Sequence, residues 1–135
     1  MIQSGIDIIE NHRITRAMER FGMRFLNRIY TPLEQMQAGG RVQALAARFA
    51  AKEAVSKMLG TGIGPVSWLE MEILDGHMGA PILKLHGRAR TRADRMGLES
   101  WTVSMSHIEA YSVAVAAGIG NPPGEEDESQ NWSQH

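Results

Sequence analysis

The chain has 135 residues, of which 43% are hydrophobic, and this size suits one domain with a single core. Its formal net charge of −1 hides an asymmetry, because four of the acids lie in residues 121–135. Removing these four leaves 14 basic and 11 acidic side chains, a net charge of +3 that suits an anionic partner. Cysteine is absent, which excludes disulfides, zinc–thiolate sites and thiol nucleophiles. The sequence shows neither an apolar run of membrane-spanning length nor a signal-peptide pattern, so we expect a cytoplasmic protein with no membrane contact.

Residues 1–10 predict a β-strand, because β-branched isoleucines recur along them. Asp7 lies inside this run between two isoleucines, where a half-buried carboxylate needs a partner. Two interpretations stay open. Asp7 faces solvent or an arginine, or it is an oxygen ligand for Mg²⁺ held on a rigid strand.

A helix is predicted over residues 12–21, with Asn11 as its cap and one apolar stripe facing the core. The stripe consists of Ile14, Ala17, Met18 and Phe21. Arginines follow another face of this helix and continue just beyond it: Arg13, Arg16, Arg20, Arg24 and Arg28. Such a row is usually a solvated face, but only Glu19 compensates it, so an acidic protein partner is plausible. Nucleic acid is not expected, because stacking aromatic residues and a nucleic-acid motif are both missing.

Thr31 and Glu34 predict a capping box that begins a short helix, which Gly39 and Gly40 end. A longer helix is then predicted from about residue 42 to Gly60.

This longer helix is apolar on several sides, which indicates burial, yet it carries four charges. Arg48 and Lys52 lie one turn apart, and Glu53 and Lys57 form a second such pair on another face. Glu53–Lys57 is either an ordinary local ion pair or part of a site for a polyphosphate and its metal ion. The Gly-rich loop that follows, Gly60 to Gly64, favours the second interpretation.

The second half of the chain predicts a strand over 66–74, a strand over 81–85 and an Arg-rich helix over 87–96. Leu69, Met71 and Ile73 are expected on the buried face of the first of these strands. Two further strands, 101–106 and 110–117, are joined by a tight turn that holds His107. His107 is either a surface turn residue or a contact for phosphate or adenine. Residues 1–120 therefore form the domain, and 121–135 form an acidic tail expected to be disordered.

These motifs, in this order, resemble the holo-[acyl-carrier-protein] synthases, the small class of 4'-phosphopantetheinyl transferases. The resemblance covers about residues 2–118. It rests on the run from Arg48 to Ala54, together with three shorter motifs. These are Gly5-Ile6-Asp7, Gly79-Ala80-Pro81 and Ser104-Met105-Ser106-His107. The fold it implies is α+β, with a small mixed or antiparallel sheet wrapped around a long central helix.

The resemblance also implies an activity. Such enzymes transfer the 4'-phosphopantetheine group of CoA to a serine of apo acyl carrier protein and release adenosine 3',5'-bisphosphate. They are Mg²⁺-dependent, are typically homotrimers with active sites between subunits, and serve lipid metabolism, with fatty acid biosynthesis as the expected pathway. A non-catalytic CoA- or nucleotide-binding module with the same fold is the alternative.

Carried onto this chain, the resemblance implies that Asp7 and Glu53 bind Mg²⁺ and that Lys57 reaches the CoA phosphates. The other positions expected to line the CoA site are Arg48, Lys52, Ser56, Gly60, Gly62 and His107. Arg13 matches a carrier-protein contact, and the arginine row formed by Arg13, Arg16, Arg20 and Arg24 is the expected docking surface. Glu53, Asp7 and a water on the metal remain alternatives for the group that removes the serine proton.

Overall fold

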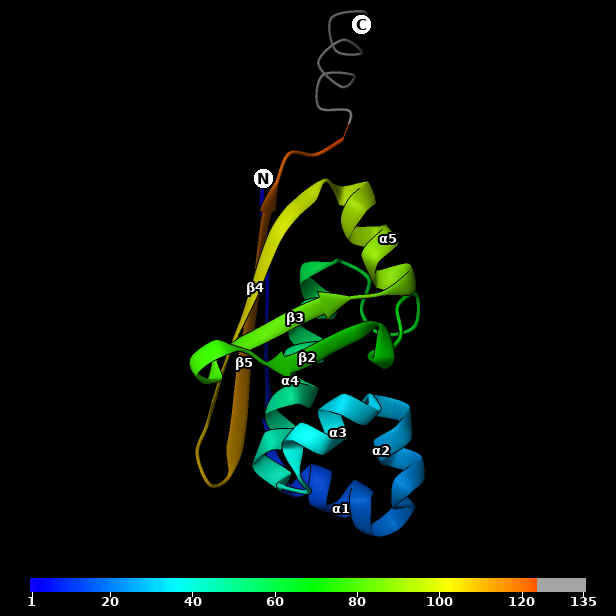
Figure 1. The fold of residues 1–135 in the computed structure, drawn as a ribbon, viewed down its shortest axis with the longest axis vertical. Helices are drawn as coiled ribbons and strands as arrows, with labels where there is room; N and C mark the ends of the chain where they lie inside the picture. Colours follow the sequence, from blue (N-terminus) through cyan, green and yellow to red (C-terminus); the bar gives the residue numbers. More distant parts are fainter. Residues whose placement is uncertain (124–135) are drawn as a thin grey trace, which may run out of the picture.

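The computed structural model of the chain describes residues 1–123, in which two antiparallel sheets and four shorter helices surround one long helix (Figure 1). This arrangement confirms the expected α+β class. The helices are α1 (Asn11–Phe21), α2 (Met23–Ile29), α3 (Pro32–Ala38), α4 (Val42–Met58) and α5 (Gly87–Met96). The strands are β1 (Ile2–Glu10), β2 (Met71–Asp75), β3 (Pro81–Leu85), β4 (Leu98–His107) and β5 (Tyr111–Gly120). Two short 3-10 helices, η1 (Trp68–Glu70) and η2 (His77–Gly79), flank β2.

Helix α4 is the centre of the fold. The larger sheet, with strand order β1-β5-β4, packs on one side of it, and the β2–β3 hairpin, α1 and α3 pack on others. Because α4 has neighbours on most sides, it is apolar nearly all round, as its sequence predicts. Ala50, Ala51 and Ala54 are fully buried, and their small side chains allow the strands to approach the helix closely.

Several local predictions are confirmed. The capping box of α3 is present, with the Thr31 side chain accepting a bond from the Glu34 backbone and the Glu34 side chain accepting one from the Thr31 backbone. Helix α5 ends at Gly97, which adopts the left-handed conformation that a helix C-cap favours. The hairpin of β2 and β3 pairs Met71 with Leu85 and Asp75 with Pro81.

The prediction for Asn11 is wrong. Glu10 occupies the cap position of α1 without a side-chain bond, and Asn11 is the first helical residue. The buried Asn11 amide instead donates to the carbonyls of Ile108 and Glu109, at 3.1 and 3.0 Å, and accepts a 2.7 Å bond from Ser112. Asn11 therefore ties the start of α1 to the β4–β5 turn, a partner more than 90 residues away along the chain.

Two apolar predictions also differ from the structure. Phe21 is 51% exposed, because α1 ends there and Gly22, with a φ of 56°, turns the chain into α2. The strand expected over residues 66–74 is shorter, since residues 68–70 form a 3-10 turn in which Leu69 is 40% exposed. Met71 and Ile73 are fully buried, as expected.

Strand β5 ends at Gly120, and residues 124–135 lie outside the described part of the chain, so the expected disorder of the tail stays a prediction. Among residues 1–123, no helix has the length and apolar character needed to cross a membrane.

Candidate active site

Strand β1 touches α4 at Gly5. A Cβ atom at this position would lie 2.0 Å from the carbonyl oxygen of Ala54 and 2.9 Å from the Cβ of Lys57, so only glycine fits. Side chains alternate across a strand, and Asp7 therefore faces the same side as Gly5. Asp7 is half-buried there, whereas Ile6 and Ile8 on the opposite face are 60% and 62% exposed. The close contact thus delivers the Asp7 carboxylate to the surface of α4.

Asp7, Glu53 and Lys57 come together at this contact, as their spacing and the resemblance predict. The Lys57 ammonium donates to Asp7 Oδ1 at 3.2 Å and to the carbonyl of Ile6 at 2.9 Å. Lys57 of α4 therefore pairs with Asp7 of β1, and this helix–strand pair replaces the local Glu53–Lys57 ion pair that spacing alone allowed. The Lys57 side chain stays 52% exposed and Asp7 21% exposed, so a ligand has access to both.

Burial raises the pKa of Glu53, and the neighbouring Asp7 charge raises it further. Lys57 and Arg13 act in the opposite direction but do not cancel these effects. The pair of carboxylates thus carries negative charge that the protein alone does not fully compensate.

The donor set of this site fits a magnesium ion. Mg²⁺ prefers carboxylate oxygens and usually binds one or two of them, together with water and substrate phosphates. Asp7 and Glu53 provide such a pair, and within residues 1–123 no cluster of three or more His, Asp or Glu side chains forms a complete protein cage. Two carboxylates alone would leave coordination positions of such an ion for a phosphate ligand.

The loop after α4 is shaped by glycines. Gly60 and Gly62 have φ angles of 73° and 63°, a conformation that side chains disfavour. The N–H of Gly60 donates to the carbonyl of Lys57, and those of Thr61 and Gly62 donate to Ser56. These three amides therefore cap the C-terminus of α4. The N–H groups of Gly60 and Gly62 are therefore already bonded within the chain, and the place of these two glycines in the CoA site stays a prediction.

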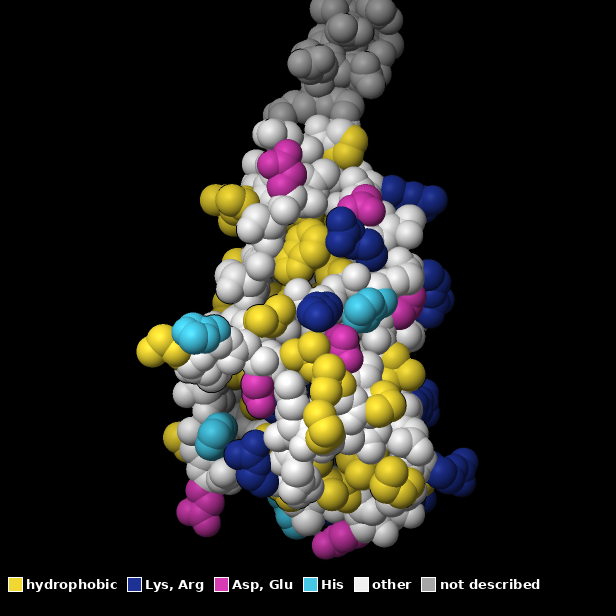
Figure 2. Space-filling view, in the orientation of Figure 1, with side chains coloured by type: hydrophobic (Ala, Val, Ile, Leu, Met, Phe, Trp, Pro, Cys, Tyr) yellow, Lys and Arg dark blue, Asp and Glu magenta, His cyan; other side chains and the backbone are white. Residues whose placement is uncertain are grey.

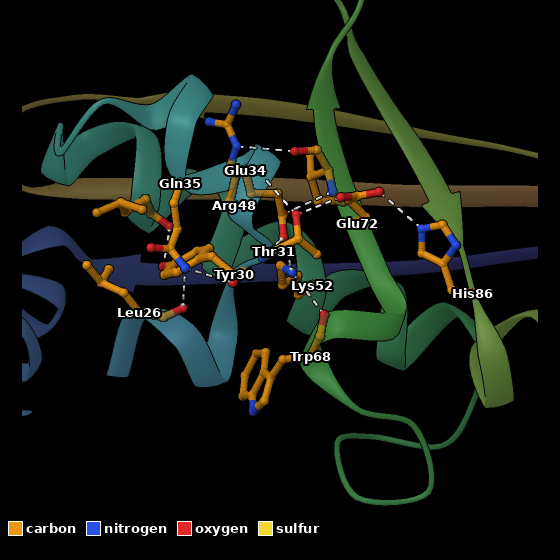
Figure 3. Close-up of polar contacts among 12 residues, drawn as sticks. Leu26, Tyr30, Thr31, Glu34, Gln35, Arg48, Lys52, Trp68, Glu72 and His86 are labelled. Atoms are coloured by element: carbon orange, nitrogen blue, oxygen red, sulfur yellow. Dashed lines mark hydrogen bonds and ion pairs between the residues drawn. The ribbon is translucent and has the colours of Figure 1, made fainter. Parts of the chain in front are cut away.

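Three residues expected to line the CoA site face the interior. Lys52 and Ser56 are fully buried, and Arg48 is 3% exposed. Lys52 bonds to Glu34 at 2.7 Å and to the carbonyl of Trp68 at 2.9 Å (Figure 3). The predictions for Lys52 and Ser56 are wrong for this chain, because neither side chain reaches the surface.

Arg48 is similarly engaged. Its guanidinium donates to the carbonyls of Ile73 and Ala44, at 3.2 Å each, and to Asp75 Oδ1 at 3.0 Å. The side chain of Asp75 is 50% exposed, so the ion pair with Arg48 lies at the edge of the interior. Arg48 therefore joins α4 to the end of β2, and the structure does not bring it to Asp7 and Glu53.

Glu34 is the centre of this interior network. The sequence predicted its role in a capping box but not its burial or its ion pair with Lys52. Besides Lys52, its carboxylate accepts bonds from the backbone N–H groups of Thr31 and Ile73. It thereby links α3, α4 and β2, and burial lowers the pKa of Lys52 against the opposing effect of Glu34. The capping box predicted the local bond of Glu34, but no sequence signal indicated its burial.

His107 lies at the end of β4, exposed, opposite Ser112 of β5. Asp7 lies on β1, beyond β5, and pairs with Ala114. Adjacent strands are about 4.8 Å apart, so His107 is roughly 10 Å from the line of β1. A single chain therefore does not bring His107 to the carboxylates.

The arginine row continues from α1 to α2. Arg13, Arg16 and Arg20 border a hollow of about 530 Å³ with Ala17 and Phe21. A neighbouring hollow of about 390 Å³ shares Ala17 and Phe21, and its other lining residues are Arg24, Phe25, Arg28, Ile29 and Trp68. None of these arginines has a carboxylate partner in the described part of the chain. The two hollows form one surface that is basic at its rim and apolar at its base.

Comparison with known proteins shows the family. Residues 3–116 match the family model of the 4'-phosphopantetheinyl transferase superfamily. The chain is 40% identical over 127 residues to a holo-[acyl-carrier-protein] synthase of Herpetosiphon aurantiacus, covering 89% of this chain and 100% of the relative. It is 47% identical over 119 residues to the Moorella thermoacetica enzyme of that name, covering 86% of this chain and 92% of the relative.

A solved structure is similar as well. It is the Helicobacter pylori holo-[acyl-carrier-protein] synthase in complex with coenzyme A, with a TM-score of 0.79 and 34% sequence identity. The match covers 88% of this chain and 100% of that one. The chain therefore belongs to the 4'-phosphopantetheinyl transferase superfamily and, within it, to the holo-[acyl-carrier-protein] synthases.

Proposed function

We propose that the protein transfers the 4'-phosphopantetheine group of CoA to a serine of apo acyl carrier protein. The observation that carries this proposal is the cluster of Asp7, Glu53 and Lys57 at the contact of β1 with α4, in a chain of this family. The serine oxygen forms a bond to the β-phosphorus of CoA. The bond from that phosphorus to the bridging oxygen breaks, and adenosine 3',5'-bisphosphate leaves.

Each residue of the cluster has a role that follows from its surroundings. Lys57 lies at the rim with its ammonium group half-exposed, where it stabilises charge on the phosphate oxygens in the transition state. Asp7 accepts a hydrogen bond from Lys57, which orients its carboxylate. Glu53 is half-buried beside Asp7 and is the proposed acceptor for the serine proton.

The enzyme is proposed to depend on Mg²⁺, held by Asp7 and Glu53. When bound, the ion would supply positive charge to the pyrophosphate and compensate the two carboxylates. The support for this is the position of the two carboxylates, since burial and then the neighbouring Asp7 charge raise the pKa of Glu53.

The surface formed by the two arginine-lined hollows is the proposed docking site for the carrier protein. Arg13, Arg16, Arg20 and Arg24 would attract an acidic partner, and the apolar base between them would receive an apolar side chain. Arg13 also lies close enough to Glu53 to affect its pKa. A carrier protein on this surface would therefore present its serine beside the carboxylates.

The protein is also proposed to be a homotrimer. The outer face of the larger sheet is apolar and exposed, with Ile2, Ile6 and Ile8 at 78%, 60% and 62%. Ile2 lies opposite Ile119 and Ile6 opposite Val115, both also exposed. A continuous apolar face of this kind marks a subunit interface. Sites between subunits would also let His107 of one chain serve the carboxylates of another.

The proposed location is the cytoplasm, and the proposed pathway is fatty acid biosynthesis. The pathway is proposed because the acceptor is a carrier protein that must be primed before acyl chains are built on it.

The test is to incubate the protein with apo acyl carrier protein, CoA and Mg²⁺ and to weigh the carrier protein by mass spectrometry. The expected result is a gain of one phosphopantetheine, absent with Glu53→Ala and absent when EDTA replaces Mg²⁺. CoA binding without any gain of mass would instead identify a non-catalytic CoA-binding module. Light scattering after size exclusion checks the trimer independently.

A further inference from the structure

Helix α5 carries arginines on two faces, one of which packs against β4 while the other borders a groove. Arg90 pairs with Asp94 at 3.1 Å and lies over the Trp101 ring at 5.5 Å, so it joins α5 to β4. The other three, Arg88, Arg92 and Arg95, follow one another at helical spacing along a different face. This face borders a groove of about 370 Å³, whose other lining residues are Thr61, Pro65, Val66 and Thr91.

The charge of this α5 groove is poorly compensated. Arg88 pairs with Glu70 at 3.2 Å, while Arg92 uses its Nε to bind the carbonyl of Leu59 at 2.9 Å. Within residues 1–123, neither Arg92 nor Arg95 has a carboxylate within ion-pair distance. Three guanidinium groups therefore share one carboxylate. In Figure 2, Lys and Arg side chains project from the side of the molecule on which Figure 1 places α5.

The described chain ends beside this helix. The N–H of Asn121 donates to the carbonyl of Gly97, the C-cap of α5, at 3.1 Å. Pro123 is packed so closely that a Cβ on Gly97 would meet its Cδ at 2.8 Å. Pro123, the last described residue, therefore lies at the end of α5 that carries Arg95.

The next residues are acidic and have the right reach. Positions 125–128 read Glu-Glu-Asp-Glu, two to five residues after Pro123. At about 3.3–3.6 Å per extended residue, they can extend roughly 7–18 Å from it. Arg88 and Arg95 are separated by seven helical rises, about 10 Å at roughly 1.5 Å per residue. The acidic run can thus lie along the whole basic face.

We propose that residues 125–128 occupy the α5 groove of their own chain. Four carboxylates face three arginines, and the short tether keeps their effective concentration high. An acidic segment needs no fixed fold for this contact, because the attraction comes from charge and is screened by salt. The proposal concerns binding within the chain and does not depend on the transfer reaction.

A photo-crosslink tests the proposal, and the absence of cysteine in the chain makes the labelling site unique. Ser129→Cys in the full chain is labelled with a maleimide benzophenone, irradiated at low salt and mapped by peptide mass spectrometry. The expected insertion sites lie in residues 61–66 and 88–95. Because the attraction is electrostatic, the yield there should fall about tenfold at about 1 M NaCl.

Two controls separate charge from mere proximity. The first replaces the four acids of 125–128 with Gln, Gln, Asn and Gln, which keeps the tether and removes the charge. The second is Arg92→Gln with Arg95→Gln, which removes the uncompensated cations. Each should lower the yield in the groove as strongly as salt does. Yields that stay unchanged in both, insertion elsewhere on the molecule, or links only between two chains would each overturn the proposal.

Discussion

Helix α4 presents charged side chains on two sides, and the two sides differ in whether their charges are satisfied. On the inner side, the Lys52 ammonium is fully buried and bonded to Glu34 and to Trp68 (Figure 3). On the outer side, Glu53 and Lys57 meet Asp7 at a surface where Lys57 is half-exposed. Lys52 and Lys57 are only five residues apart in the same helix.

The difference separates a structural role from a chemical one. Burial of an ion pair is costly, and it persists only where geometry and further hydrogen bonds are good. The inner pair meets this condition, since every described buried side-chain polar atom has a partner. On the outer side, Glu53 does not meet this condition, because burial and the Asp7 charge keep its pKa raised. The candidate site therefore differs from the inner ion pair in two ways: its charges are accessible, and they are not fully compensated.

The largest expected effect comes from removing the inner cation. Lys52→Met leaves the Glu34 carboxylate buried without its partner, so the free energy of unfolding should fall by about 3–5 kcal/mol. Urea denaturation followed by circular dichroism measures this. Lys57→Met is the matched control, with the same substitution on the outer side, and should change stability little while it impairs transfer. Equal destabilisation by the two variants would contradict the assignment of separate roles.

Removing an outer carboxylate should impair catalysis and leave the fold intact. Asp7→Ala or Glu53→Ala should lower kcat for phosphopantetheine transfer by roughly 100- to 1,000-fold, because each removes stabilisation of the transition state. Steady-state kinetics with apo carrier protein measures the rate, and a thermal melt checks that the fold is intact. Near-normal turnover in either variant would remove that residue from the metal site.

A smaller effect is expected at the docking surface. Arg13→Glu should raise the KM for carrier protein roughly 3- to 10-fold at low salt, and less at high salt, because exposed charge pairs are weak and screened. Kinetics at two ionic strengths measures both changes. Arg95→Glu makes the same charge change on α5 and should leave this KM unaltered. A KM for Arg13→Glu that is normal at low salt would exclude Arg13 from docking.

The smallest effect concerns stability without metal. Because the pKa of Glu53 is raised above its ordinary value of 4.5, the native state binds its proton more tightly than the unfolded chain does. The free energy of unfolding of the metal-free protein therefore falls as the pH rises from 4.5 through the pKa that Glu53 has in the folded state. Above that pKa the loss is complete. Glu53→Gln should remove this loss.

Melting curves in EDTA check this effect. Glu53→Gln should melt slightly higher than the parent at pH 7, and the difference should shrink as the pH is lowered toward 4.5. Added Mg²⁺ should stabilise the parent and not the variant. A parent that melts higher than the variant in EDTA at pH 7 would show that Glu53 is already compensated by the protein.

Much of the fold could be predicted from local signals. The alternating isoleucines of β1, the capping box at Thr31 and the left-handed Gly97 after α5 each depend on residues close in sequence. Asp7 stood out because a carboxylate between isoleucines is rare in a strand. Glu53 and Lys57 were selected by helical spacing together with the family resemblance.

Two other predictions failed because a contact that the local pattern does not reveal decides the structure. Asn11 resembled a helix cap, but its amide bonds to carbonyls at Ile108 and Glu109. Leu69 fitted an alternating strand, but the backbone N–H of Glu70 closes a 3-10 turn with Ser67. In both cases a local pattern had a competing tertiary or turn contact that periodicity does not reveal.

The sequence by itself determined the family, most of the elements and the choice of Asp7, Glu53 and Lys57 as candidate site residues, because motif order and helical spacing are properties of the chain. Only the tertiary structure decided which lysine of α4 is structural. Helix α3 brings Glu34 over Lys52, while the close contact at Gly5 brings Asp7 to Lys57. The two lysines belong to one helix, and their surroundings differ because different elements pack against its two sides.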